Sequence, residues 1–264
     1  MEVRLFPNSA RAGVGQRPKQ ESQRPLLPQH ARHCPVLEAG SAAGFLVYPP
    51  LAENEAFHVE FQGEGQYRFT FYMGEPGTQW TPLFNINYLL PVGSVGRMTE
   101  QVEFLQETPF SPDGARKMAR IFIVPEDLGT PTGGITLRGA TNFQTPEGWD
   151  TIYTPIFNNI ERPMAPMLVV RVETDWYANE TEFRYVVQPG EVIPGAHNLP
   201  IGQVLFVPRE PITFRDCNEE ELAAIKQSKK MFSRSKAAVT LSTPYGFEYS
   251  PHYARESRAR RKQE

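Results

Sequence analysis

The amino-acid sequence predicts an all-β protein, folded as a single jelly-roll, β-sandwich or distorted barrel domain with one amphipathic helix near the C-terminus. Three observations predict it. Short apolar runs follow one another at intervals of roughly ten to fifteen residues, as in sandwiches and barrels. The 25 prolines and 20 glycines fall mainly between these runs. The 17 phenylalanines and 10 tyrosines favour strands over helices.

The first 33 residues predict a disordered basic arm, because prolines, arginines and glutamines leave too little apolar surface to offset the entropy of ordering. The folded domain is expected over residues 34–215. Residues 56–61 and 66–72 alternate apolar and polar side chains around Gly63-Glu64-Gly65, which predicts a β-hairpin. Its apolar face would carry Phe57, Val59 and Phe61. Further strands are expected at residues 43–48, 80–90, 119–124, 134–138, 149–157, 167–174, 182–187 and 202–207, with a short helix as the alternative at 80–90.

The helix is expected over residues 216–238. Asn218 can cap its first turn while Glu221 returns the hydrogen bond, and Lys229 and Lys230 suit its negative end. Leu222, Ile225 and Phe232 recur at helical spacing, so one stripe of the helix is expected to lie on the sheet. Residues 239–264 predict an irregular basic tail.

The net charge of −3 hides an uneven distribution. Residues 1–33 carry a net +4, residues 226–264 carry +7, and the body between them carries −14. An acidic body disfavours nucleic-acid binding, which draws most of its affinity from cationic contacts, whereas the tails could bind polyanions. No run of 18 apolar residues predicts a membrane span.

The cysteine content and the first residues predict a cytoplasmic protein. Cys34 and Cys217 are the two cysteines of the chain and are expected to be unpaired thiols. The first thirty residues are polar and lack the apolar core of a signal peptide.

Several short motifs resemble a family of bacterial proteins to which no activity is attached. They are Cys34-Pro35-Val36-Leu37 with Gly44, then Gly148-Trp149, Pro155, Asn158, Glu173-Thr174-Asp175-Trp176 and Leu199-Pro200-Ile201-Gly202-Gln203. The resemblance covers most of residues 34–211. It implies a single domain and no particular chemistry.

A fainter resemblance links residues 172–176 and 201–206 to the late strands of dUTPases and dCTP deaminases. It implies a jelly-roll fold in which Glu173 takes the acid position and Trp176 the aromatic position beside it. A dUTPase-like nucleotide hydrolase with bound Mg²⁺ is therefore one alternative function. The serine-rich phosphate motif of those enzymes is absent, and Pro131-Thr132-Gly133-Gly134 is a loose counterpart.

A second alternative is a non-haem Fe(II)/2-oxoglutarate-type oxygenase. His58, Glu60 and His197 follow the order of a two-His-one-carboxylate iron site, and Arg209 lies where an arginine could clamp a carboxylate cosubstrate. His58 and Glu60 share one face of the predicted strand, opposite the face of Phe57.

The leading expectation is a protein that binds a small organic ligand or a peptide at the mouth of the barrel, through Glu173, Asp175 and Trp176. Glu173 and Asp175 would lie on one side of a strand, where paired carboxylates can bind a cation or divide acid and base roles. Trp176 and Tyr177 would form an aromatic wall or pack in the core. A third alternative is a protein-interaction module that recruits a partner through an exposed sheet edge, and an oligomer is possible.

Overall fold

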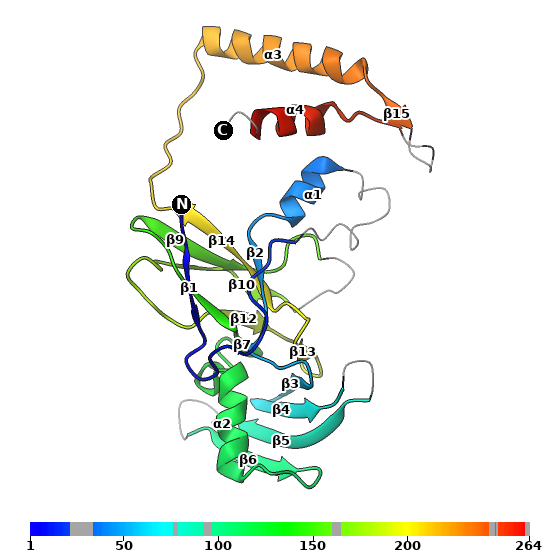
Figure 1. The fold of residues 1–264 in the computed structure, drawn as a ribbon. Coiled ribbons are helices and arrows are strands. Elements are labelled where there is room, and N and C mark those ends of the chain that lie inside the picture. The colour runs from blue at the N-terminus through cyan, green and yellow to red at the C-terminus, as the bar shows by residue number, and fades with distance from the viewer. Residues whose placement is uncertain are drawn as a thin grey trace. The chain divides into compact units, whose positions relative to one another are not determined.

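The computed structural model describes residues 1–21, 34–75, 79–91, 97–159, 165–242, 246 and 248–261. Among these residues, Met1 to Arg209 form a first compact unit, except for residues 34–36, which belong with the residues from Glu210 onward to a second unit. Every strand pairing between described residues is antiparallel (Figure 1). The β-rich fold class predicted from the sequence is therefore confirmed.

The largest sheet of the first unit has five strands and contains the predicted hairpin. β3 and β4 pair in register, with Phe57 opposite Phe71 and Val59 opposite Phe69, and turn at Gly63-Glu64-Gly65. Apolar residues of both strands face the core. Residues 80–90, for which the sequence allowed either a strand or a short helix, contain the strand β5. The strand order is β13 (Val192–Ala196), β3 (Glu55–Gly63), β4 (Gln66–Met73), β5 (Thr81–Leu89) and β6 (Thr99–Phe104).

Three smaller sheets complete the first unit. The four-stranded sheet has the order β11 (Val170–Val172), β9 (Trp149–Thr154), β14 (Gly202–Pro208) and β2 (Phe45–Val47). The three-stranded sheet has the order β10 (Met167–Leu168), β12 (Glu182–Val186) and β7 (Gly134–Arg138), and β1 (Arg4–Pro7) pairs with β8 (Thr141–Gln144). The single strand expected over residues 167–174 is wrong: β10 and β11 belong to different sheets and are separated at Val169.

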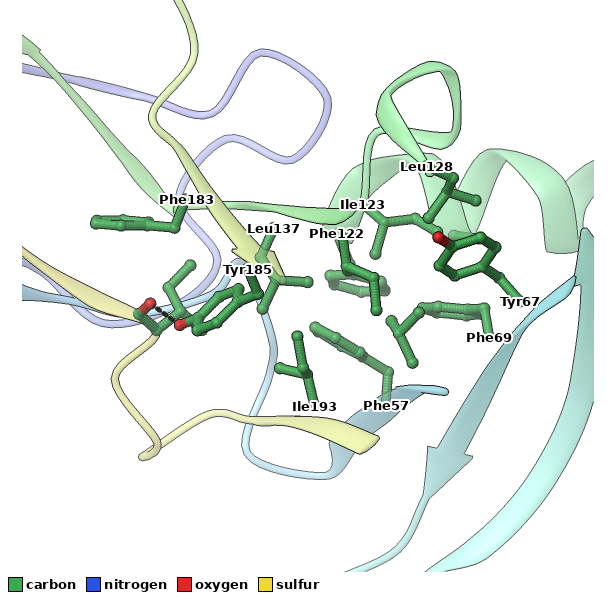
Figure 2. Close-up of a cluster of buried hydrophobic side chains, with 14 of the residues drawn as sticks. Phe57, Tyr67, Phe69, Phe122, Ile123, Leu128, Leu137, Phe183, Tyr185 and Ile193 are labelled. Carbon is green, nitrogen blue, oxygen red and sulfur yellow. Dashed lines mark hydrogen bonds between the residues drawn. The ribbon is translucent and has the colours of Figure 1, made fainter. Parts of the chain in front are cut away.

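The core of the first unit joins the five-stranded sheet, the three-stranded sheet and helix α2 (Pro112–Phe122) (Figure 2). The ring of Phe122 stacks against Phe57 with centroids 5.2 Å apart and against Phe71 with centroids 5.9 Å apart. Tyr185 donates a hydrogen bond from its hydroxyl to the carbonyl of Ile201. Burial of these aromatic side chains is the main source of stability in this unit.

Helix α2 corrects the strand expected over residues 119–124. Ser111 caps the helix by accepting a hydrogen bond from the N–H of Gly114, and Pro112 occupies the first turn. Ala115, Ala119 and Phe122 recur at helical spacing and are fully buried. Residues 121 and 122 are therefore the end of an amphipathic helix, and Ile123 after it is extended and bridges Leu137.

The N-terminal residues also differ from the expected arm over 1–33. Arg4 to Pro7 form β1, and Asn8 is buried and donates a hydrogen bond to the carbonyl of Gly139. Arg11 makes a bidentate ion pair with Glu55, at 2.5 and 2.6 Å. These long-range contacts supply the order that the local composition lacks. Residues 22–33 lie outside the described residues.

The second unit contains the predicted helix, α3 (Glu219–Ala237). The side chain of Asn218 accepts from the N–H of Glu221, and the carboxylate of Glu221 accepts from the N–H of Asn218, as expected of a capping box. No residue of α3 is buried. The irregular tail is replaced in part by β15 (Leu241–Ser242), β16 (Glu248–Tyr249) and α4 (His252–Arg261). Arginine and alanine are strong helix formers, which explains α4.

The described part of the chain thus contains α1 (Pro35–Ser41), α2, α3 and α4, where one helix was expected. None of these helices is long and apolar enough to cross a membrane. Cys34 and Cys217 are both free thiols, as predicted.

Candidate functional site

The segment with Glu173, Asp175 and Trp176 is a tight turn that follows β11. The N–H of Tyr177 donates to the carbonyl of Glu173, 3.0 Å away, so the chain makes one helical turn after Val172. Thr174 is buried, and its hydroxyl lies 2.9 Å from that of Thr145 and 2.7 Å from that of Thr151. Because the strand ends before the turn, the expectation that Glu173 and Asp175 share one strand face is wrong.

Arg209 links this turn to the four-stranded sheet. Its Nη2 lies 2.6 Å from Oδ1 of Asp150 and 2.7 Å from Oδ1 of Asp175, and its Nη1 lies 3.8 Å from Oε2 of Glu173. Asp150, on β9, is 1% exposed and also accepts a hydrogen bond of 2.5 Å from Nε of Arg171. The N–H of Gly148 donates to Oδ2 of Asp175. The guanidinium suggested as a clamp for a cosubstrate is thus already bound to two carboxylates.

The electrostatics of this network keep both aspartates ionised. Burial alone would raise the pKa of Asp150, but the hydrogen bonds and charges of Arg209 and Arg171 hold it below its usual value. The hydrogen bond from Arg209 is the main cause that lowers the pKa of Asp175. The two carboxylates in turn raise the pKa of Arg209. Neither aspartate therefore holds a proton at neutral pH that it could donate as a general acid.

Trp176 projects from the turn into solvent. Its side chain is 68% exposed, and its ring centroid lies 5.6 Å from that of Tyr177, which is also exposed. The indole Nε1 donates a hydrogen bond of 2.5 Å to Oε2 of Glu173, which fixes the direction of the ring. From the sequence, Trp176 and Tyr177 were expected either to form an aromatic wall or to pack in the core. Core packing is wrong, because both side chains lie on the surface.

The three residues of the proposed iron site have separate partners. Nδ1 of His58 lies 2.8 Å from the hydroxyl of Tyr72, Glu60 accepts from Nε2 of Gln62, and Nδ1 of His197 lies 2.7 Å from the carbonyl of Leu51. Among the described residues, no three His, Cys, Asp or Glu side chains are grouped as metal ligands would be. His58, Glu60 and His197 are all described, so the structure does not bring them together.

His58 gives a testable pH dependence. Its burial lowers its pKa, with the charge of Arg68 acting in the same direction and that of Glu60 against it. The unfolded chain, whose histidine pKa is near 6.5, therefore binds the proton more readily than the folded chain. The free energy of unfolding should be highest above that pH and should fall as pH drops from about 6.5 towards the lower folded pKa.

Urea unfolding of the wild type and of His58→Gln at several pH values between about 5 and 8 would measure this loss. The glutamine keeps a partner for Tyr72 and does not titrate, so its curve should be flatter over this range. Equal pH dependence of the two proteins would show that His58 does not cause it.

Sequence reasoning identified Arg209, Glu173 and Asp175 but missed Asp150 and Arg171, which complete the network. The signal was present: both are charged residues inside strands expected to be apolar. A buried charge of this kind needs a partner of opposite sign.

Sequence reasoning also missed the polar group on the three-stranded sheet, where Arg184 pairs with Asp127 and Arg138 lies 3.4 Å from Glu182. Burial raises the pKa of Glu182.

Comparison of the chain with models of known protein families and with curated protein sequences finds no match. Neither of the two resemblances noted from the sequence motifs is supported by these comparisons. The functional argument therefore rests on the geometry of the turn and of the strands beside it.

Proposed function

We propose that this protein is a binding module that takes up an extended peptide of a partner protein along the edge of β11, with Trp176 as an anchor. The proposal combines the peptide-binding and protein-interaction expectations and moves the site from a barrel mouth to a sheet edge. The single observation that carries it is an apolar strand edge, covered by no described strand, that leads into an exposed and oriented tryptophan. The jelly-roll arrangement of the sheets, expected from the sequence, is a separate prediction and stays one.

The edge of β11 differs from two other sheet edges of the first unit, those of β2 and β7. β2, at the opposite edge of the same sheet, is continued by a bridge between Leu46 and Lys19. β7, at the edge of the three-stranded sheet, is continued by a bridge between Leu137 and Ile123. β11 pairs with β9 on one side, and no described residue bridges its other side. Because no described strand covers this edge, it suits pairing with another chain.

The side chains at the start of this edge and just before it are apolar and exposed. Val170 of β11 is exposed, and so are Leu168 of β10 and, at 63%, Val169 between the two strands. Natural edge strands are usually protected by charged residues or proline, and here the one charged side chain, Arg171, is held by Asp150. An apolar edge of this kind suits an added strand, which gains affinity from main-chain hydrogen bonds and specificity from alternate side chains.

The network around Arg209 prepares Trp176 for binding. Thr174 is buried, Asp175 is bound to Arg209, and Glu173 accepts from the indole, so the turn and the ring are ordered before a partner arrives. Less conformational entropy is then lost on association. Tryptophan is also the residue type that most often dominates the binding energy of an interface. The roles of Glu173 and Asp175 in this proposal are to position Trp176, not to contact the peptide.

Selection of random unstructured peptides against the full-length protein would test the proposal. The recovered peptides should carry β-branched or aromatic residues at alternate positions, because alternate side chains of a strand face the same way. Trp176→Ala should weaken their binding by about tenfold or more, as measured by calorimetry. Val169→Lys should weaken it as well, since it places a charge on the apolar edge.

Val192→Lys is the matched control, because Val192 is an exposed valine on β13, an edge strand of the five-stranded sheet. Its peptide affinity should equal that of the wild type. Recovery of no peptide, or equal weakening by Val169→Lys and Val192→Lys, would contradict the proposal.

A further inference from the structure

We infer that the second unit binds double-stranded DNA without sequence preference, through the basic outer face of α3. This inference concerns a different surface from the peptide site and does not depend on it. It begins from the charge of the chain, since residues 226–264 carry a net charge of +7. The structure shows how those charges are arranged.

The basic residues of α3 lie on one side of the helix. At 100° per residue, the side chains of Lys226, Lys229, Lys230, Arg234 and Lys236 fall within about half of the helix circumference. All five are exposed. None of them makes an ion pair with another residue that the structure describes. Five uncompensated positive charges therefore face solvent along a stretch of about 15 Å.

The opposite side of α3 faces α4 and carries Ala224, Gln227, Ser228, Met231, Phe232 and Ser235. A groove of about 780 Å³ lies between the two helices and is lined by Ala224, Met231 and Phe232 of α3 and by Tyr253 of α4. The ring centroid of Phe232 lies 4.9 Å from that of His252. The contact with α4 thus fixes which side of α3 is turned outward. On α4, Arg255 and Arg258 lie outside the residues that line this groove and add two more cations.

Charge complementarity and shape favour duplex DNA as the partner. A regular row of phosphates complements a regular row of lysine and arginine side chains. A helix with its side chains is about 10–12 Å wide, which matches the major groove of B-form DNA at about 12 Å, whereas the major groove of an RNA duplex is too narrow to admit it. The one aromatic side chain of α3, Phe232, lies in the groove between the helices, so the basic face of α3 offers no platform for stacking unpaired bases.

A membrane surface fits the same face less well. A helix that lies in a lipid interface needs a broad apolar side opposite its basic side, free to enter the bilayer. In α3 the side opposite the lysines is turned towards α4.

The test is binding of the full-length protein to a fluorescent DNA duplex of about 25 base pairs, followed by anisotropy in a series of salt concentrations. Five phosphate contacts predict a slope of log K against log salt of about −4.5. Neutralising Lys226, Lys230 and Arg234 together (Lys226→Gln, Lys230→Gln and Arg234→Gln) should reduce the slope to about −2 and weaken binding by more than about tenfold at 0.1 M salt. Glutamine keeps the helix propensity, and circular dichroism would verify that α3 persists.

The matched control replaces three exposed arginines of the first unit, with the changes Arg4→Gln, Arg17→Gln and Arg97→Gln. It alters the net charge by the same amount and should leave the DNA affinity and the slope unchanged. Three further probes are an unpaired oligothymidine, an RNA duplex and vesicles with anionic lipid. Equal losses in the two triple variants, or tighter binding to any of these three probes than to the DNA duplex, would overturn the inference.

Discussion

Phe122→Ala is expected to lower the free energy of unfolding by about 3–5 kcal/mol, because it opens a cavity at the centre of the aromatic core. Phe122 is fully buried, and its ring meets those of Phe57 and Phe69 at centroid distances of 5.2 and 6.3 Å (Figure 2). The ring of Phe71 lies 5.9 Å from it on the same measure. Phe122 is one of the residues through which α2 packs on the five-stranded sheet. The loss would be measured by urea unfolding followed by circular dichroism.

The control for this variant is Phe104→Ala. Phe104 lies on β6 of the same sheet but is 38% exposed, so its replacement removes less buried surface and should cost clearly less than that of Phe122. Similar losses for the two variants would mean that the aromatic cluster around Phe122 is not the core of the first unit.

Gly133→Ala is expected to cost about 2–5 kcal/mol, through backbone strain and a clash that act together. Gly133 has a φ of +79°, where an L-residue is strained, and a Cβ at this position would lie 2.1 Å from the carbonyl oxygen of Val187. The backbone there cannot move freely, because the N–H of Val187 donates to the carbonyl of Gly133 and the N–H of Gly133 donates to the hydroxyl of Tyr67. Urea unfolding would again measure the loss.

Gly190→Ala separates the two causes. Gly190 has a φ of +85° and no atom within 4 Å of its added Cβ, so its replacement introduces strain without a clash and should cost about 1–2 kcal/mol. If Gly133→Ala lowers the free energy of unfolding by no more than Gly190→Ala does, the clash with Val187 does not contribute to the loss.

The parts of the fold that follow from short-range pattern were predictable from sequence. The hairpin of β3 and β4 has alternating side chains and a glycine turn, and α3 has its cap at Asn218, so each carries its own local signal. Residues 119–124 were misread because a window of six apolar and polar residues fits both periods. Only the cap at Ser111, eight residues upstream, decides for a helix.

The parts that depend on distant contacts were not predictable. Nothing near Arg11 in the sequence indicates that Glu55 lies beside it, and nothing near Arg209 indicates Asp150. The candidate site shows the same division. The sequence singled out Glu173, Asp175 and Trp176 as unusual residues on a strand. Their actual roles depend on where β11 ends and on which guanidinium reaches them, and both follow from tertiary packing.

The bridge between Lys19 and Leu46 bears on how the protein can be shortened. A chain trimmed to begin at Cys34, the start of the domain expected from sequence, would lose β1, the buried Asn8 and the ion pair of Arg11 with Glu55. It would also uncover the backbone of β2, so that the four-stranded sheet would be open at both ends. Two open ends allow copies to stack end to end, so we expect a truncated protein of this kind to polymerise more readily than the full chain.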